Sequence, residues 1–226
     1  MHALPFARRS TVSLRATSLT KVFGETIALW DVDFTCRSTE LITIQGTNGS
    51  GKSTLLRIVA GVVAPTRGRI TWGTDAREAR PRIGLLGHAT HLFDELSAIE
   101  NVELAAALAH RDGDVAAALL GRLGVGQHAG RRVGSLSAGT RRRVGLARTL
   151  ATDPDVLLVD EPFAGLDQAA ADLVARALST ARDEGRLVVI ATHDDARTRS
   201  IATRTVPLEE GRIRVGMNPA AEATAG

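Results

Sequence analysis

The sequence is poor in several residue types, and each shortage excludes a class of protein. One cysteine, Cys36, stands among 226 residues, so the chain forms no internal disulfide and has no partner for a cysteine-based metal site. No uncharged run approaches the roughly 18 to 20 apolar residues that cross a bilayer, so we expect that the chain does not span a membrane by itself. The opening residues, MHALPFARRS, hold too short an apolar run for a secretory signal. We therefore expect a cytoplasmic protein.

Lysine is also scarce, because the only two lysines are Lys21 and Lys52 among 28 cationic residues. We interpret Lys21 as a solvated surface charge. The net charge of +3 gives no argument for a nucleic-acid footprint. With 44% hydrophobic and 23% charged residues, the composition is that of a globular protein long enough for one domain with an inserted subdomain.

Strand-like and helix-like segments follow one another along the chain. Residues 10–45 show the near-alternating pattern of β-strands, and residues 53–63 change to a helical period. Residues 89–152 are helical in character, and Ser97 and Glu100 are spaced as a capping box. The apolar strands DVLLVDEP and RLVVIATHD follow, with an amphipathic helix between them. This order predicts a mostly parallel sheet covered on both faces, with ligands beyond the carboxyl ends of its strands.

The segment GTNGSGKST follows a predicted strand, begins a helix and fits the phosphate-loop pattern G-x-x-x-x-G-K-[ST]. Glycines let backbone amides turn toward phosphate oxygens, and the helix N-terminus adds partial positive charge. Lys52 is expected to reach the β- and γ-phosphates, and the Ser53 hydroxyl to ligate Mg²⁺.

Acidic residues and a histidine end two later strands. In VLLVDEP, Asp160 is placed to hold the metal and Glu161 to polarise a water for attack on the γ-phosphate. Two solvated acids are the alternative, which the phosphate loop makes the weaker one. In IATHD, His193 either contacts the γ-phosphate or is structural.

The segment LSAGTRRRVGLAR places Ser137 and Gly139 at the start of a helix, with residues 141–143 as three arginines in its first turn. Cations there oppose the helix dipole, which indicates a nearby phosphate or carboxylate. A solvated basic face is the alternative for Arg141 and Arg142. Upstream, Phe23 either stacks on adenine or belongs to the core.

Taken in order, GTNGSGKST, LSAGT, VLLVDEP, AGLD and ATHD resemble the nucleotide-binding subunit of ATP-binding cassette (ABC) transporters over residues 11–215. The resemblance implies an α/β P-loop NTPase fold: a mostly parallel sheet, an N-terminal antiparallel β part and an inserted α-helical subdomain. It implies that Glu161 is the catalytic base, that His193 is the switch histidine and that Phe23 stacks on adenine of ATP. Ser53 and Asp160 would hold Mg²⁺. The residues that would cradle the phosphates are Gly46, Thr47, Asn48, Gly49, Ser50, Gly51, Lys52, Ser53 and Thr54.

The implied domains are a RecA-like core with its N-terminal β part at residues 10–87 and 153–215, and a helical signature subdomain at residues 88–152. Residues 1–9 and 216–226 are expected to be flexible termini.

The resemblance also implies partners. Two cassettes would close head to tail around two Mg·ATP, with Ser137 and Gly139 contacting the nucleotide of the second copy. The chain would form a homodimer or pair with a second ATP-binding subunit. Integral membrane permease subunits would hold it on the inner face of the cell membrane, and we expect no nucleic-acid partner.

Two positions depart from the family pattern. His88 stands where the family usually has a glutamine after the strand that enters the helical insert, and Thr140 replaces the last glutamine of the signature. Imidazole still ligates metal or holds water, so we include His88 among the catalytic residues. The Gly-His pair, LSAG and the compact length resemble the heme-exporter ATPases of cytochrome c maturation. The alternative is the ATPase of an exporter for a drug, lipid or peptide.

Two other classes fit less well. Cassette proteins that act on DNA or ribosomes carry a very long coiled-coil insert or two tandem cassettes, whereas this chain has one copy of each motif. A small-molecule kinase would need neither LSAGT nor His193, and it would exclude water with a lid.

Overall fold

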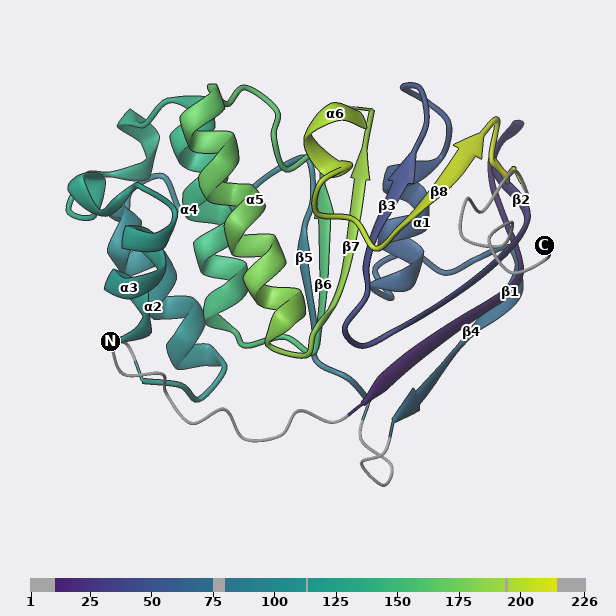
Figure 1. The fold of residues 1–226 in the computed structure, drawn as a ribbon, viewed down its shortest axis with the longest axis horizontal. Coiled ribbons are helices and arrows are strands. Elements are labelled where there is room, and N and C mark those ends of the chain that lie inside the picture. Colours follow the sequence, from purple (N-terminus) through teal and green to yellow (C-terminus); the bar gives the residue numbers. More distant parts are fainter. Residues whose placement is uncertain (1–10, 75–79, 113, 194, 215–226) are drawn as a thin grey trace, which may run out of the picture.

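The computed structural model of the chain describes residues 11–74, 80–112, 114–193 and 195–214. The flexible termini expected at residues 1–9 and 216–226 lie outside these ranges. Figure 1 shows a layer of helices, a central sheet and a second, smaller sheet. In chain order the elements are β1 (Val12–Phe23), β2 (Thr26–Arg37), β3 (Leu41–Gln45), α1 (Lys52–Val59), β4 (Arg67–Thr74), β5 (Ile83–Leu86), α2 (Ala98–Leu108), α3 (Val115–Arg122), the 3₁₀ turns η1 (Gly126–His128) and η2 (Val133–Ser135), α4 (Ala138–Ala151), β6 (Val156–Asp160), α5 (Gln168–Asp183), β7 (Leu187–Thr192), α6 (Asp195–Thr198), β8 (Arg204–Glu209) and β9 (Arg212–Ile213).

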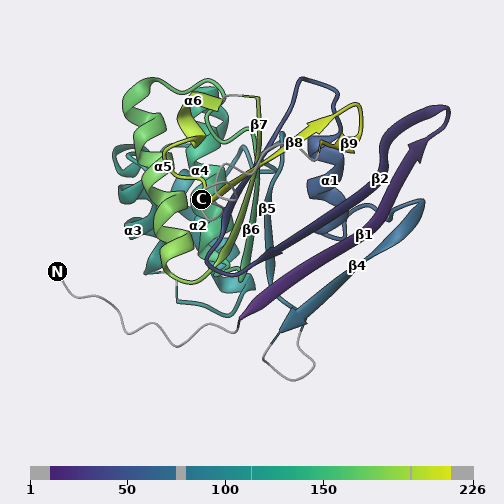
Figure 2. The same cartoon turned by 45° about the vertical axis from the view of Figure 1, so that its right-hand side comes forward.

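The two sheets have different strand directions. The larger sheet has the order β5-β6-β7-β3-β8-β9, in which every pair from β5 to β8 is parallel and β9 is antiparallel. The smaller sheet, β2-β1-β4, is antiparallel throughout. Figure 2 shows it on the side of the larger sheet that α1 covers. The predicted α/β fold, with its N-terminal antiparallel part, is confirmed.

The larger sheet separates two apolar cores because successive strand residues point to opposite faces. In β6, Leu157 and Val159 pack with α5 and the helical layer. Val156 and Leu158 pack on the other face with α1 and the antiparallel sheet. All five residues of this strand are buried. A strand buried on both faces is fixed in position at its end, where site residues follow.

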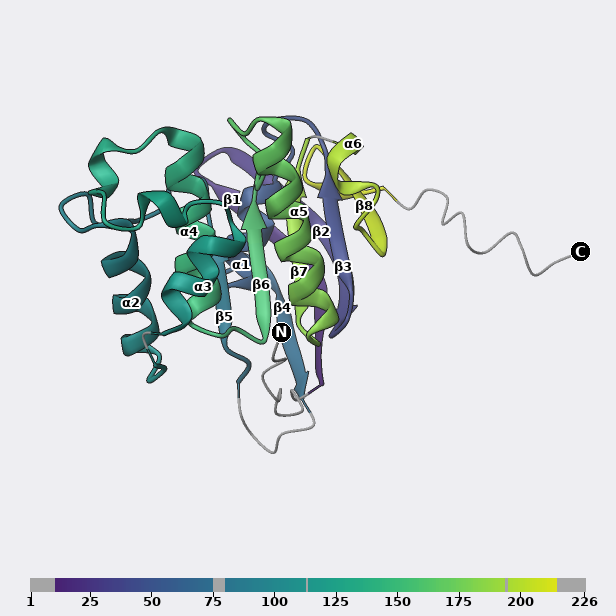
Figure 3. The same ribbon diagram turned by 60° about the vertical axis from the view of Figure 1, so that its left-hand side comes forward.

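The helices α2, α3 and α4 pack against one another beyond the β5 edge of the sheet (Figure 3). The predicted capping box begins α2: the Ser97 amide donates to Glu100 Oε2 at 2.7 Å, and the Glu100 amide donates to Ser97 Oγ at 3.3 Å. The hydrogen bond from the Ser97 side chain lowers the pKa of Glu100. These helices lie within residues 88–152, and the boundaries of the helical subdomain stay a prediction.

The predicted site segments follow four strands of the larger sheet and lie at one edge of it. The phosphate loop follows β3, His88 follows β5, Glu161 follows β6 and His193 follows β7. Because these strands are parallel, their carboxyl ends meet at the same edge (Figure 1). Within the described ranges no helix is both long and apolar enough to cross a membrane.

Candidate active site

Lys52 is the first residue of α1, and its side chain folds back over the loop that precedes it. The side chain is buried, with 6% of its surface exposed. Its ammonium donates to the carbonyl oxygens of Gly46 at 2.7 Å and Thr47 at 2.9 Å. An ammonium has three N–H donors, so one remains for an anion held in the loop.

Two glycines give this loop its shape. A Cβ at Gly46 would collide with the Leu208 carbonyl oxygen and lie 2.5 Å from Ser50 Oγ. Gly51 has φ +104, and a Cβ there would meet the Ala28 carbonyl oxygen. Other residues rarely adopt such a backbone. The loop therefore needs glycine at both positions to pack against the backbone of Leu208 and Ala28.

Asp160 ends β6 with its carboxylate almost fully buried at 4% exposure. Among the described residues, three buried side-chain oxygens have no hydrogen-bond partner: Asp160 Oδ1, Ser50 Oγ and Thr43 Oγ1 within β3. Burying a carboxylate oxygen without a hydrogen-bond donor costs free energy. Binding a divalent cation removes that cost, and carboxylate oxygens are common ligands of such cations. Asp160 therefore fits a divalent cation such as Mg²⁺, and the unpartnered Ser50 hydroxyl fits a phosphate oxygen.

Glu161 follows directly, and its carboxylate is held by the end of β7. Thr192 Oγ1 donates to Glu161 Oε2 at 2.9 Å. Glu161 Oε1 accepts from the amide of His193 at 3.2 Å and lies 2.9 Å from His193 Nδ1. The backbone of Glu161 has φ +48, a left-handed conformation that carries strain in a residue with a Cβ and is common at functional sites.

The signature residues lie at the N-terminus of α4. Ser137 caps this helix by accepting a hydrogen bond from the Thr140 amide at 3.3 Å, and its Oγ lies 2.9 Å from Thr140 Oγ1. A Cβ at Gly139 would lie 2.8 Å from the Gly165 carbonyl oxygen. Glycine therefore lets the loop before α5 approach the signature closely. Ser137 is exposed, as a contact with a second copy would require.

The three arginines of α4 have different partners, and the alternative of a solvated face is wrong for one of them. Arg141 Nη2 lies 2.6 Å from Asp94 Oδ1, which is the carboxylate that the helix dipole indicated. Arg143 Nη1 donates to the carbonyls of Leu123 and Gly124 within the helical layer. Arg142 belongs to no solvated face: it is 7% exposed and donates to backbone carbonyls. The negative partial charge that Arg142 contacts is carried by backbone carbonyl oxygens, and their position next to Arg142 cannot be predicted from the sequence.

Phe23 and His88 are both exposed. Phe23 ends β1 at 48% exposure, so the core alternative is wrong and the ring is open to a stacking partner. Lys21 is not a freely solvated charge, because its Nζ lies 4.7 Å from the centre of the Phe23 ring and donates to the Ala64 carbonyl at 3.0 Å. His88 follows β5, and its carbonyl accepts from Arg142 Nη1 at 3.2 Å.

Thr192 was missing from the predicted site. Its position, directly before the histidine in ATHD, was the available signal. A threonine at a buried strand end places its hydroxyl beside the neighbouring strand, and β6 pairs with β7 through Asp160 and Ala191.

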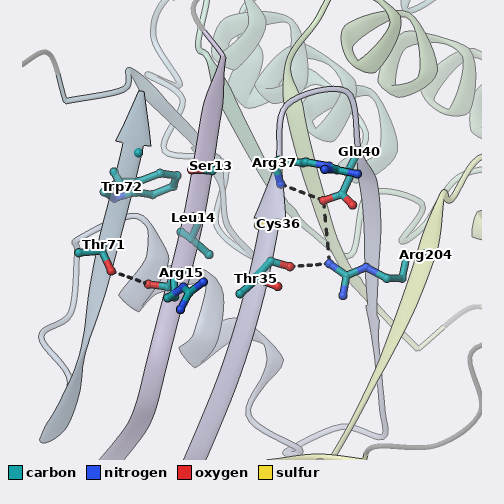
Figure 4. Close-up of a pocket in the computed structure, with 11 residues that line it drawn as sticks. Ser13, Leu14, Arg15, Thr35, Cys36, Arg37, Glu40, Thr71, Trp72 and Arg204 are labelled. Atoms are coloured by element: carbon teal, nitrogen blue, oxygen red, sulfur yellow. Dashed lines mark hydrogen bonds and ion pairs between the residues drawn. The ribbon is translucent and has the colours of Figure 1, made fainter. Parts of the chain in front are cut away.

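A separate pocket of about 530 Å³ lies over the antiparallel sheet. Figure 4 shows Arg204 between Glu40 and the Thr35 carbonyl that it binds. Because Glu40 precedes β3 and Arg204 begins β8, this pocket lies at the amino ends of those strands. It is therefore distinct from the edge that gathers the predicted site residues. Cys36 borders it, and burial raises the pKa of its thiol to about 12.

Comparison with known proteins decides the family. A family model described as ABC transporter matches residues 29–164, from β2 through the loop that follows Glu161. The chain belongs to the ABC transporter family. Its fold and family together make it a cassette of the ABC ATPase type.

Relatives of this ABC cassette include exporters and importers. The macrolide export ATP-binding/permease protein MacB of Rhodopseudomonas palustris (strain BisB18) is 37% identical over 221 residues, which cover 91% of this chain and 34% of that protein. The cytochrome c biogenesis ATP-binding export protein CcmA of Nitrosomonas europaea is 38% identical over 189 residues, covering 80% of this chain and 89% of that one. The phosphonates import ATP-binding protein PhnC 1 of Natronomonas pharaonis is 36% identical over 214 residues, covering 88% and 91%. The chain thus spans about a third of the length of MacB.

A solved structure shows the same fold. The dimeric post-hydrolysis state of an ATP-binding cassette bound to ADP and Pi superposes with a TM-score of 0.80 at 28% identity, over 89% of this chain and 96% of that one.

Proposed function

We propose that this ABC cassette is the ATP-hydrolysing nucleotide-binding subunit of a transporter. The observation that carries the proposal is the set of contacts that hold the Glu161 carboxylate. Thr192 and His193 hold it at the residue that directly follows Asp160, whose buried Oδ1 has no partner, at the sheet edge that also carries the phosphate loop. A fixed carboxylate next to a cation site and a phosphate loop is the arrangement that phosphoryl transfer to water requires.

Each residue has a role in this proposal. The loop amides and the remaining N–H of Lys52 bind the β- and γ-phosphates. When bound, Mg²⁺ neutralises phosphate charge, and Ser53 and Asp160 are the residues that would hold it. Glu161 accepts a proton from the attacking water. His193, beside Glu161, is positioned to contact the γ-phosphate, and His88 lies on the neighbouring strand end. Phe23 stacks on the adenine.

We further propose that two copies, or this chain and a second ATP-binding subunit, close head to tail around two Mg·ATP. Support comes from the dimeric assembly of the solved cassette and from the exposed signature end of α4. The name of MacB, an ATP-binding/permease protein, supports integral membrane permease subunits as partners. Those subunits would hold the cassette on the inner face of the membrane.

For the cargo, we propose heme export for cytochrome c biogenesis. The Gly87–His88 pair and LSAG support it, as does the similarity to CcmA over 89% of that protein's length. The alternative is an exporter for another cargo, such as a drug, lipid or peptide, and the macrolide exporter MacB favours that reading.

ATP turnover tests the proposed chemistry. The purified parent chain should release phosphate from Mg·ATP, and Glu161→Gln should reduce kcat by about a hundredfold or more, because a general base contributes on the order of 10² to 10⁴. Binding of ATP should persist in the variant. A parent chain without turnover, or a variant at the parental rate, contradicts the proposal.

Complementation tests the cargo. In a bacterium that lacks its own CcmA, the chain should restore covalent heme in c-type cytochromes, and Glu161→Gln should not. An actively hydrolysing chain that leaves the cytochromes without heme contradicts heme export and favours another cargo.

A further inference from the structure

Arg142 is a buried cation in α4 that contacts the catalytic edge of the larger sheet. Its Nε donates to the Glu161 carbonyl at 2.8 Å, and its Nη2 donates to the Asp160 carbonyl. Its Nη1 donates to the carbonyls of Gly87 at 3.3 Å and His88 at 3.2 Å. One side chain from the signature helix therefore holds the backbone of both segments that carry Asp160, Glu161 and His88.

The strand register explains why two of these four carbonyls, those of Asp160 and Glu161, need a donor. The strands β5 and β6 pair in parallel as far as Leu86 and Val159. Beyond that pair β5 ends, so the carbonyls of Asp160 and Glu161 have no partner from β5. A buried carbonyl without a hydrogen bond is unfavourable. The guanidinium takes the place of the missing strand and bridges the two backbones where they separate.

The chemistry of the position favours arginine. Burial lowers the pKa of Arg142, and the charges of Asp160 and Glu161 act in the opposite direction. A guanidinium presents N–H donors in a planar fork, whereas a lysine ammonium is a compact point charge that cannot span two diverging backbones. Four carbonyl dipoles and two nearby carboxylates offset part of the cost of burying the cation.

Glu161 shows what this contact controls. Its left-handed backbone, φ +48, persists only when the surroundings hold it. The Glu161 amide donates to the Ala191 carbonyl at 2.7 Å, and Arg142 holds the Glu161 carbonyl. The peptide groups on both sides of the Cα are thus fixed, one by β7 and one by α4. The direction of the Cα–Cβ bond follows from them, and with it the position of the carboxylate.

We infer that Arg142 is a positioning residue for ATP hydrolysis: it links the signature helix to the catalytic edge and sets the backbone that aims Glu161 and presents His88. This inference rests on the proposed ATPase function. Because α4 also carries Ser137, a shift of the signature when a second copy engages it reaches Glu161 through this side chain. Arg142 lies outside the phosphate loop, so the inference assigns it to turnover and not to ATP affinity.

Arg143 provides a matched control. It is the next residue of α4, and it also donates to backbone carbonyls: those of Leu123 and Gly124 at 3.0 and 3.1 Å and, one turn back in α4, that of Gly139 at 3.4 Å. All three carbonyls lie in the helical layer. Replacing it removes a comparable set of hydrogen bonds without touching the catalytic edge.

The experiment compares the parent chain with Arg142→Gln and Arg143→Gln in steady-state turnover, ATP-binding calorimetry and hydrogen–deuterium exchange. We expect Arg142→Gln to lower kcat by about tenfold to hundredfold, since a misplacement of about 1 Å costs that much. Its KM and its Kd for ATP should stay within about twofold of the parent, a change of under half a kcal/mol on the affinity scale. Peptides containing Gly87–His88 and Asp160–Glu161 should exchange faster. Arg143→Gln should keep the parental kcat, with faster exchange confined to the helical layer.

A second variant and a second background keep the test decisive. Arg142→Lys retains the charge without the fork, so it should show the same low kcat if Arg142→Gln does not fold. In a Glu161→Gln background, Arg142→Gln should lower turnover no further, because Arg142 acts through Glu161. Parental kcat in Arg142→Lys or Arg142→Gln, with unchanged exchange at the two segments, overturns the inference. An inactive parent chain instead refutes the proposed function, and the exchange measurement still decides whether Arg142 holds the two segments.

Discussion

Two of the three N–H donors of Lys52 bind carbonyl oxygens of the phosphate loop, at 2.7 and 2.9 Å. This buried point charge sits among carbonyls where the planar fork of an arginine does not fit. We predict that Lys52→Arg weakens ATP binding by about tenfold to hundredfold, the value of hydrogen bonds to a charged group. Calorimetric titration with ATP measures it, with an unchanged unfolding midpoint as the control for folding. Parental affinity would show that the ammonium does not contact the phosphates.

Cys36 gives a second test at this scale. It is 5% exposed, and desolvation by burial, with a smaller effect of Glu40, raises its pKa to about 12. At pH 8 only about a ten-thousandth of such thiols are ionised, and the thiolate is the reactive form. A thiol reagent should therefore label the folded chain far more slowly than the chain unfolded in guanidinium. Equal rates in both states would contradict the burial of this residue.

Single residues also show where sequence reasoning stops. The placement of the phosphate loop, Asp160, Glu161 and His193 at one sheet edge could be predicted, because each lies at the end of an apolar strand and parallel strands end at one edge. Arg142 could not, because its partners are backbone carbonyls that are exposed only where β5 stops before β6 does. The sequence alone does not distinguish the three adjacent arginines of α4. Only the tertiary structure shows that they have different partners.

At the scale of elements, the capping box of α2 was predicted from Ser97 and Glu100 and is confirmed. The strands β8 and β9 were not predicted. Charged residues interrupt their apolar positions, and β8 is stabilised by pairing with β3, far away in the sequence. Local patterns identify caps and buried strands, whereas long-range pairing decides the edge of the sheet.

The capping box makes a prediction about stability. Ser97→Ala should lower the free energy of unfolding by about 0.5 to 2 kcal/mol, because the Glu100 amide loses its acceptor. Urea denaturation measures the change. Glu100→Gln serves as the matched control, since glutamine also closes a capping box and should cost less. A Ser97→Ala variant as stable as its parent would contradict the role of the cap.

At the scale of the whole molecule, the exposed Ser137 at the start of α4 and the phosphate loop after β3 belong to one chain but would serve different nucleotides. The order of motifs predicted this arrangement through the family resemblance, and the solved relative is a dimer. The cargo could not be predicted in the same way, because relatives of similar identity include exporters and an importer.

The most direct test is the mass of the Glu161→Gln variant in solution with and without Mg·ATP, measured by size-exclusion chromatography with light scattering. Because we expect the variant to bind ATP without consuming it, we predict a shift from 23.9 kDa to about twice that mass on addition of Mg·ATP. The same variant with Lys52→Arg added should need about tenfold to hundredfold more Mg·ATP to reach that mass, since it binds the nucleotide more weakly. A Glu161→Gln chain that binds ATP and remains monomeric at every concentration would contradict the head-to-tail closure.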